Sequence, residues 1–320
     1  MSVRSSDQVQ RVAFTTDAGV GPRALLGLIV LETDRTVEAE VRSLRLDGVA
    51  HHVSRIPMDV TVTAETLRAM EARIPVAAGL LPPAFGFDAI GYACTSGATL
   101  IGAERVAAAV GIAHPGVSCT DPITAALAAF RTLDVRSIGL LTPYNAEVTL
   151  GMAAHYEDRG IEVTAVASFL EEDDNVVGRI TEASVADAVR RIGVEPGCDA
   201  VFVSCTSLRT FGIVADLEAE LGRPVVSSNQ ALAWHLHRLA GVQDAVPGLG
   251  TLFEHGLPAG TKCRRGGFRT GNTNGGPSPP RPCWPSDGST HCWCVPSPKS
   301  ATSPASTHPS GRARRVRGSS

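Results

Sequence analysis

The feature that most limits how this chain can fold is a sequence repeat with a period of about 111 residues. The segment "FDAIGYACTSG" matches "CDAVFVSCTSL", so that Asp88 aligns with Asp199 and Cys94 aligns with Cys205. Two further pairs, "LLGLIVLETD" with "SIGLLTPYN" and "GVSCTDPITAAL" with "PVVSSNQALAWHL", repeat at a similar offset. Three matching blocks in one order indicate two halves related by duplication.

Each half alternates short apolar runs with segments of helical spacing. Runs such as "ALLGLIVL" suit strands of a buried parallel sheet, and "DPITAALAAFRTL" opens with the Asp-Pro pair of a helix start. We expect strands over 24–31, 87–93, 116–119, 137–145, 161–169, 198–204 and 223–228. We expect helices over 36–46, 64–81, 98–110, 121–133, 145–160, 184–192, 211–222 and 229–241. The predicted fold class is α/β, with two similar halves that each hold a short parallel sheet flanked by helices, related by a pseudo-twofold axis.

Composition divides the chain further. We predict an N-terminal extension at 1–23, a first half at 24–135, a second half at 136–256 and a tail at 257–320. The tail holds both lysines of the chain, eight arginines and a single acid, and it shows no apolar periodicity. It is predicted to be a disordered basic segment rich in Pro, Ser and Arg. The abrupt change of composition also suggests a frameshifted extension, which resequencing the gene near codon 256 would test.

The charge of residues 1–256 bears on the possible partners. They carry 19 basic and 31 acidic residues, so they would repel nucleic acids and anionic membranes. There is no signal-peptide core and no run of 18 apolar residues. The four cysteines before the tail form no CxxC pair, so no metal site is expected. A cytoplasmic homo-oligomer with reduced thiols is the resulting prediction.

The repeated cysteines suggest where the functional site lies. Cys94 and Cys205 each follow a predicted parallel strand, and ligands bind at the carboxyl ends of such strands. If the halves face each other, both thiols meet in one cleft between them. A lone cysteine at a strand end is usually a small buried apolar residue. The repeated Cys-Thr-Ser context favours a functional pair, and Cys119 and Cys198, which lack it, are interpreted as structural.

The residues after the first cysteine suggest what the site binds. Gly97 is expected to permit an unusual backbone conformation, and the next helix N-terminus favours an anion. The hydroxyls of Thr95 and Ser96 add hydrogen-bond donors. Such a loop would hold a carboxylate and lower the pKa of the thiol beside it. A small dicarboxylate, or a carboxylate with an acidic α-carbon, fits two facing loops of this kind.

Other polar residues lie at predicted strand ends or in the loops that follow. Asp34 would either bind a cationic group or cap the following helix, and Tyr144 would donate to a carboxylate or line the wall. Asn175 is a candidate substrate donor, whereas the four acids before it read as a solvated turn. His235 and His237 do not share a helix face, which argues against a metal pair.

These motifs resemble the aspartate/glutamate racemase superfamily. Within it they are most similar to the branch of maleate cis–trans isomerases, arylmalonate decarboxylases and ectoine-utilisation EutA-type proteins. The resemblance runs from about residue 24 to residue 253 and includes "GYACTSGATLIG", "LLTPYN", "DDNVVGRI", "VSCTSLRT" and "PVVSSNQALAWHL". The tail resembles nothing in this family.

The resemblance implies a cofactor-free enzyme with one cysteine in each half. Cys94 would be the nucleophile or base, and Cys205 the opposing acid or base. The resemblance places carboxylate binding on Thr95, Ser96, Thr206 and Ser207, and substrate contacts on Tyr144 and Asn175. Where maleate isomerases carry a "SSNTT"-like segment, this chain has Asp34 in "TDRT", which is closer to the EutA-type proteins and makes maleate a doubtful substrate.

Four functions follow as hypotheses. The first is a two-cysteine isomerase or racemase of a small carboxylate, with a place in ectoine breakdown. The second is a decarboxylase of a malonate-type substrate, which needs only one thiol. The third is a non-catalytic protein that binds a small carboxylate. The fourth, nucleic-acid binding through the basic tail, would be lost on deletion of the residues after Gly256 and ranks last.

Overall fold

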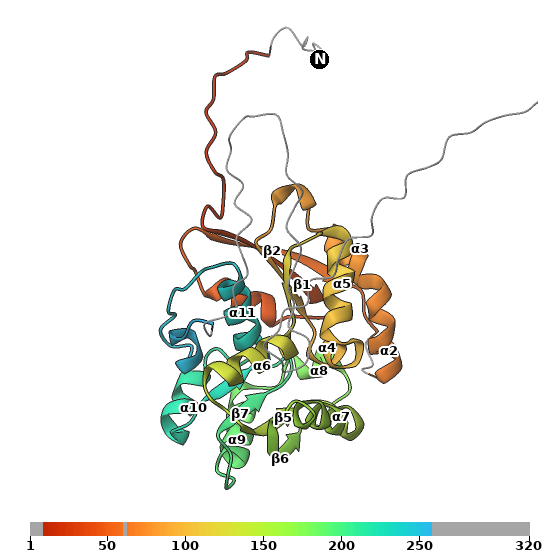
Figure 1. Ribbon diagram of the computed structural model, residues 1–320, viewed down its shortest axis with the longest axis vertical. Coiled ribbons are helices and arrows are strands. Elements are labelled where there is room, and N and C mark those ends of the chain that lie inside the picture. Colours follow the sequence, from red (N-terminus) through yellow and green to blue (C-terminus); the bar gives the residue numbers. More distant parts are fainter. Residues whose placement is uncertain (1–8, 60–62, 258–320) are drawn as a thin grey trace, which may run out of the picture. The chain divides into compact units, whose positions relative to one another are not determined.

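The computed structural model describes residues 9–59 and 63–257, which form two parallel four-stranded sheets (Figure 1). The first sheet has the order β2-β1-β3-β4, and the second has the same order, β6-β5-β7-β8. The strands are β1 (Ala24–Leu31), β2 (Val49–Ile56), β3 (Ala89–Ala93), β4 (Ser118–Thr120), β5 (Ser137–Thr142), β6 (Glu162–Ser168), β7 (Ala200–Val203) and β8 (Val225–Ser227). The predicted α/β fold with two similar halves is confirmed.

Eleven α-helices connect and flank these strands in the described part of the chain. They are α1 (Val37–Ser43), α2 (Ala64–Ala69), α3 (Ile74–Gly79), α4 (Thr95–Ile101), α5 (Ala103–Ala113), α6 (Pro122–Thr132), α7 (Ala146–Glu157), α8 (Asp174–Val177), α9 (Glu182–Gly193), α10 (Val214–Leu221) and α11 (Ser228–Leu239). Two predicted helices are interrupted. The helix expected over 64–81 divides before α3, near Pro75, and the one over 98–110 divides at Gly102, whose φ is +92°.

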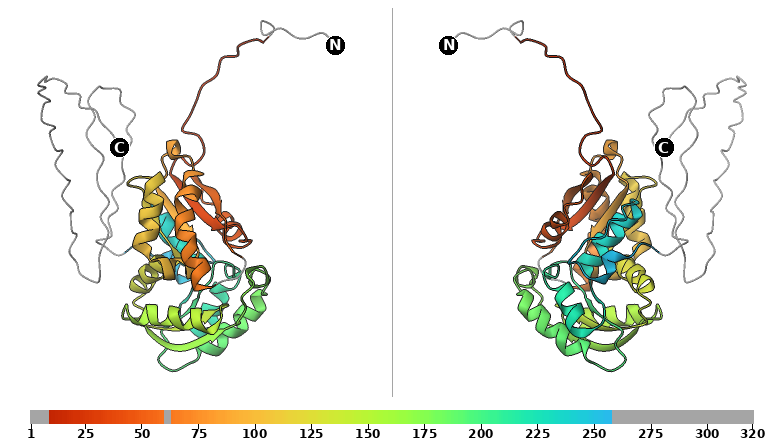
Figure 2. Two further views of the ribbon diagram at one scale, coloured as in Figure 1. Left: turned by 90° about the vertical axis from the view of Figure 1, so that its right-hand side faces the viewer. Right: turned by 90° about the vertical axis from the view of Figure 1, so that its left-hand side faces the viewer.

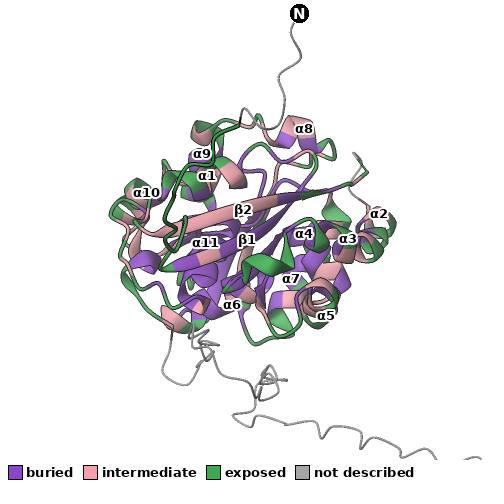
Figure 3. Cartoon of the chain, turned by 90° about the horizontal axis from the view of Figure 1, so that it is seen from above, coloured by how far each residue is buried: buried purple, intermediate pink, exposed green. Residues whose placement is uncertain are grey.

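Strand β2 is absent from the sequence-based prediction. It is an edge strand of the described sheet, and most of its residues are only partly buried, whereas β1 beside it is almost wholly buried (Figure 3). Its sequence, "VAHHVSRI", therefore lacks the continuous apolar run that marks a central parallel strand. A partly exposed edge tolerates histidine and serine, which hides the strand from pattern analysis.

The aligned aspartates occupy equivalent positions in the two sheets. Asp88 accepts a hydrogen bond from the backbone N–H of Leu25 at 2.8 Å. Asp199 accepts from the N–H groups of Arg136 and Ser137, both at 3.0 Å. Each carboxylate thus links the residue just before the third strand of its half, β3 or β7, to the start of the first strand, β1 or β5. The sequence repeat therefore reflects a repeated structural device.

The last helix of each half packs on the other half. Phe130 of α6 contacts Phe202 of β7 and Tyr156 of α7 edge to face, with ring centroids 5.5 and 5.9 Å apart. Helix α11 packs in turn on β3 and β4, where a side chain at Gly91 would meet Leu232 at 3.4 Å. Figure 2 shows α11, in cyan, among the elements of the first half. The halves predicted at 24–135 and 136–256 therefore exchange their final helices.

The described residues all lie in one compact unit, which contains both sheets. Residues 9–23 form no helix or strand and are mostly exposed. The predictions for the tail, including disorder and a frameshift, concern residues outside the described range. None of the helices in the described ranges is long and apolar enough to cross a membrane.

Candidate active site

A small closed cavity lies at the carboxyl ends of strands from both sheets. It is lined by Leu31, Met58, Leu67, Cys94, Thr95, Ser96, Tyr144, Asp174, Cys205, Thr206 and Ser207. The two cysteines follow β3 and β7, the central strands at which the strand order of each sheet reverses. The cavity volume is about 10 Å³, room for about one water molecule. The structure thus brings Cys94 and Cys205 to one site, as the repeat predicts.

Cys94 is fixed at the start of α4. Its Sγ accepts a hydrogen bond from the N–H of Gly97 at 3.3 Å and lies 3.9 Å from the hydroxyl of Ser96. A Cβ at Gly97 would lie 2.8 Å from this Sγ and 2.9 Å from the hydroxyl of Tyr92. The expected unusual backbone at Gly97 is wrong, because its φ is not positive. The glycine is required for space beside the thiol.

Cys205 lies at the start of a loop that both halves hold in place, here called the Cys205 loop (residues 204–211). The Sγ of Cys205 accepts a hydrogen bond from the N–H of Ser207 at 3.3 Å. Asn229 of α11 donates from Nδ2 to the backbone oxygens of Thr206 and Leu208, at 3.0 and 3.3 Å. These contacts hold the backbone of the loop, and the backbone in turn fixes the position of the Cys205 thiol.

Both thiols are held in their neutral form. Burial raises the pKa of Cys94 to about 11 and that of Cys205 to about 12, and the charge of Asp174 adds to both shifts. Hydrogen bonds from Gly97 and Tyr144 act in the opposite direction but are smaller. The expected lowering of the thiol pKa is therefore wrong for this closed site, because desolvation outweighs the donors.

Hydroxyl groups line the site, yet three of them already donate to protein acceptors. Thr95 donates to Ser228 at 2.9 Å, Thr206 to the backbone oxygen of Ala93 at 3.3 Å, and Ser207 to Asp174 Oδ1 at 2.8 Å. The donors left for a carboxylate are side chains of other residues and the backbone N–H groups of Thr95 and Ser96, which have no acceptor within the helix. The N–H of Gly97 already donates to Cys94.

Ser96 and Tyr144 are the hydroxyl side chains best placed to donate to a ligand. Tyr144 is buried, and its pKa is raised well above the usual value by burial and by Cys205, so it keeps its proton. Its hydroxyl interacts with both Cys205 and Ser96. The predicted place of Tyr144 at the cleft is thus matched by the structure, and its role as a donor stays a prediction.

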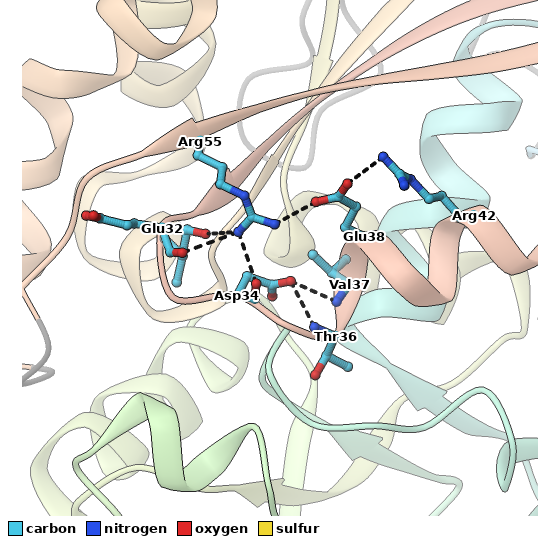
Figure 4. Close-up of polar contacts among 8 residues, drawn as sticks. Glu32, Asp34, Thr36, Val37, Glu38, Arg42 and Arg55 are labelled. Atoms are coloured by element: carbon cyan, nitrogen blue, oxygen red, sulfur yellow. Dashed lines mark hydrogen bonds and ion pairs between the residues drawn. The ribbon is translucent and has the colours of Figure 1, made fainter.

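Asp34 lies outside the cavity lining and caps the start of α1 (Figure 4). Its Oδ1 accepts from the N–H groups of Thr36 and Val37 at 3.0 and 3.1 Å, and its backbone oxygen accepts from Arg55 at 3.0 Å. Oδ2 is buried and has no hydrogen-bond partner in the described structure. Burial, with a smaller contribution from the charge of Asp174, raises the pKa of Asp34 to about 7.

Asn175 also lies outside the lining. Its backbone N–H and its Nδ2 both donate to Asp173 Oδ1, at 2.9 and 3.2 Å. Its contact with substrate stays a prediction. The residue before it, Asp174, is 6% exposed and lines the cavity, so the view of all four acids at 171–174 as a solvated turn is wrong. Helix α8 buries only its first and last residues, and this gave no sequence signal, because four residues define no periodicity.

The remaining cysteines and histidines lie away from this cavity. Cys119 and Cys198 are buried, and the Sγ of Cys198 donates to the backbone oxygen of Ala200 at 3.1 Å, in agreement with a packing role. His235 bonds to Thr120, whereas His237 faces His51 with 3.1 Å between their Nε2 atoms. Among the described residues no group of three or more His, Cys, Asp or Glu side chains could hold a metal ion.

Comparison with known proteins agrees with this geometry. The arylmalonate decarboxylase family model matches residues 61–253. The arylmalonate decarboxylase of Bordetella bronchiseptica is 35% identical over 141 residues, which cover 43% of this chain and 59% of that protein. The maleate isomerase of Nocardia farcinica is 30% identical over 244 residues, or 71% of this chain and 94% of that protein.

A solved structure shows the same similarity in three dimensions. It is a variant of the Nocardia farcinica maleate cis–trans isomerase with a covalently bound succinylcysteine intermediate. It is 26% identical, has a TM-score of 0.67, and covers 72% of this chain and 98% of that chain. The resemblance predicted from the motifs is confirmed. The chain belongs to the arylmalonate decarboxylase family, in the branch of the aspartate/glutamate racemase-like superfamily that also contains the maleate isomerases.

Proposed function

We propose that this protein is a cofactor-independent isomerase or racemase in which Cys94 and Cys205 act together on a small carboxylate. One observation carries the proposal: the two thiols reach one closed cavity from equivalent strand ends of two matching sheets. A reaction that inverts a carbon centre, or rotates a bond at that centre, requires two groups on opposite sides of the bound carbon. The succinylcysteine intermediate of the Nocardia relative supports cysteine chemistry on this fold.

Two reactions fit a pair of thiols. In a racemase, the thiolate of one cysteine removes the α-proton, and the thiol of the other delivers a proton to the opposite face of the enediolate. In an isomerase, the Cys94 thiolate forms a C–S bond to an activated double bond, whose electron pair moves toward the carboxylate. Rotation about the new single bond and cleavage of the C–S bond then give the other isomer. The isomerase thus restores the Cys94 thiolate. In the racemase the thiolate ends on the other cysteine, which is the base for the reverse reaction.

The closed cavity governs how the thiolate forms. Since burial keeps both thiols protonated, the reactive thiolate must arise when substrate binds and its contacts replace the lost hydration. Ser96, Tyr144 and the first N–H groups of α4 would hold the carboxylate and the negative charge that develops on it. The same cavity has room for only about one water molecule, which limits unselective protonation of an enediolate.

A decarboxylase of a malonate-type substrate is the second candidate. The family match favours it, because the family model is that of arylmalonate decarboxylases. In this reaction a C–C bond breaks, CO₂ leaves with the carboxyl carbon, and one cysteine protonates the remaining enediolate. A single thiol is sufficient, so the second cysteine distinguishes the two candidates. A cytoplasmic location, self-association and a place in ectoine breakdown remain predictions from the sequence.

The test is an NMR assay of the full-length protein in D₂O. The substrates are maleate, L- and D-aspartate, methyl- and phenylmalonate, and the acetylated diaminobutyrates. Geometry, α-deuteration and CO₂ loss are followed for wild type, Cys94→Ala and Cys205→Ala, with Cys119→Ala as the buried control outside the cavity. Turnover that needs both cavity thiols supports the proposal. Turnover that survives loss of Cys94 but not of Cys205 supports the decarboxylase, and turnover that needs neither contradicts both.

A further inference from the structure

The cavity contains a carboxyl group that a dicarboxylate would have to face. Among its described lining residues Asp174 has the only carboxyl group, and none is a lysine, an arginine or a histidine. A site built for a dianion is expected to offer at least one cation or a dense set of donors. Three of the lining hydroxyls already donate to protein acceptors, so the donors are few.

Asp174 is held by hydroxyls and by no cation. Its Oδ1 accepts from Ser207 at 2.8 Å and its Oδ2 accepts from Thr33 at 2.5 Å. It takes part in none of the ion pairs found within the described residues. Each carboxylate oxygen can accept more than one hydrogen bond, so Asp174 retains acceptor capacity toward the cavity. The two hydroxyls fix its orientation from both halves of the chain.

A second acid lies near enough to feel this charge. Asp34 is 3% exposed, its Oδ2 has no partner in the described structure, and the charge of Asp174 contributes to its raised pKa. Burial is the main cause of this shift, and the charge of Asp174 adds to it. A further negative charge near Asp174 is therefore disfavoured, and a cation would be favoured there for the same reason.

From this arrangement we propose that Asp174 selects a substrate that carries a cationic nitrogen beside its carboxylate, an amino-acid-type compound, over a simple dicarboxylate. The carboxylate would bind Ser96, Tyr144 and the N–H groups of α4, and the ammonium group would bind Asp174. This inference rests on the proposed function only for the location of the site.

The same arrangement links binding to thiol ionisation. The charge of Asp174 disfavours a thiolate at both Cys94 and Cys205. An ammonium group against Asp174 would cancel that charge at the moment the substrate arrives. A dicarboxylate would instead add negative charge and make the thiolate less accessible. A substrate with a cationic nitrogen would therefore favour formation of the thiolate that reacts with it.

Calorimetric binding to the full-length protein tests the proposal whether or not a substrate turns over. The probes are L-2,4-diaminobutyrate and L-alanine, which carry cationic nitrogens, and maleate and methylmalonate, which do not. Wild type is compared with Asp174→Asn, which keeps an oxygen for the Ser207 hydrogen bond, and with Asp187→Asn, a matched change at an exposed site on α9. Circular dichroism confirms that each variant is folded.

We expect wild type to bind the amino acids more tightly than the dicarboxylates. Asp174→Asn should weaken amino-acid binding roughly tenfold or more, the size of a hydrogen bond to a charged group, and should leave dicarboxylate binding unchanged or stronger. Asp187→Asn should change neither. Tighter binding of maleate by wild type, weakened by Asp174→Asn, would overturn the inference and show that a protonated Asp174 donates to a second carboxylate. The requirement for two thiols would be unaffected by that result.

Discussion

Glu40 of α1 and Asn229 of α11 are joined by a hydrogen bond of 2.6 Å, from Asn229 Nδ2 to Glu40 Oε2, behind the Cys205 loop. The other oxygen of Glu40 accepts from the N–H groups of Thr210 and Phe211, at 2.6 and 2.9 Å. A carboxylate from the first half therefore holds the loop that presents the thiol of the second half. Glu40 is a positioning residue, because it acts on the thiol through this loop.

Removal of Glu40 should loosen the Cys205 loop. Glu40→Ala leaves backbone donors without acceptors, so we expect the free energy of unfolding to fall by about 1–3 kcal/mol and Cys205 to react faster with a thiol reagent. Urea unfolding and the labelling rate, followed by mass spectrometry, measure the two effects. Glu147→Ala, at an exposed position on α7, is the control. Equal labelling of Cys205 in Glu40→Ala and wild type would contradict a positioning role.

Gly97→Ala tests the space beside Cys94. The added Cβ would lie 2.8 Å from the thiol sulfur and 2.9 Å from the hydroxyl of Tyr92, so we expect destabilisation by about 1–3 kcal/mol. A Cβ added at Gly111 of α5 would meet no atom within 4 Å. Gly111→Ala should instead raise the free energy of unfolding by about 0.5–1 kcal/mol. Thermal or urea unfolding compares the two. Equal changes in both variants would show that the contact at Gly97 is not restrictive.

The two cavity thiols should resist alkylation at neutral pH. Burial raises the pKa of Cys94 to about 11 and that of Cys205 to about 12, and only the thiolate reacts. We expect iodoacetamide labelling of both residues to be negligible near neutrality and to rise steeply only in strongly alkaline solution, as read by peptide mass spectrometry. Half-maximal labelling below pH 8 in the folded protein would contradict this account.

Asp34 should make stability depend on pH. Its pKa rises from 3.8 to about 7 on folding, chiefly through burial, so the folded state binds the proton more tightly. This contribution is fully present below pH 4 and is lost as the pH rises toward 7. Asp34→Asn keeps an oxygen for the N–H groups of Thr36 and Val37 but does not titrate. Relative to wild type, the variant should gain roughly 2–4 kcal/mol between pH 4 and pH 8. Parallel stability curves would exclude a raised pKa.

Phe130 tests the exchange of helices between the halves. Its ring packs on Phe202 and Tyr156 of the second half and is fully buried, so Phe130→Ala should lower the free energy of unfolding by about 3–5 kcal/mol. Phe85 is 52% exposed, and Phe85→Ala is the control with a much smaller expected cost. A loss at Phe130 no larger than at Phe85 would mean that α6 adds little to the second half.

The repeat carries most of what the sequence reveals about the fold. Because Cys94 and Cys205 fall at matching offsets after apolar strands, their meeting at one cavity follows from the rule for parallel sheets. Strand β2 was missed because an edge strand with histidines carries no buried apolar pattern. Local sequence also could not reveal the exchange of α6 and α11, since α6 packs on Phe202 and α11 packs on β3, both far away in the chain.

The chemistry of the site is less accessible from sequence than its location. Asp174 was interpreted together with its exposed neighbours, because a four-residue helix with two buried residues, Asp174 and Val177, is too short to show a periodicity. The hydroxyls of Thr95 and Thr206 were expected to donate to substrate, yet they donate to Ser228 and to the backbone of Ala93. Their acceptors lie in the other half of the chain, so no local motif could identify them.

The measurement that tests the central claim most directly is a double-variant cycle on turnover. The kcat/KM of wild type, Cys94→Ala, Cys205→Ala and the double variant is determined on the substrate found in the D₂O assay. If the two thiols act as one unit, each single variant should lose roughly a hundred- to ten-thousandfold, and the double variant should lose hardly more than either. Near wild-type turnover in either single variant would contradict two-cysteine catalysis.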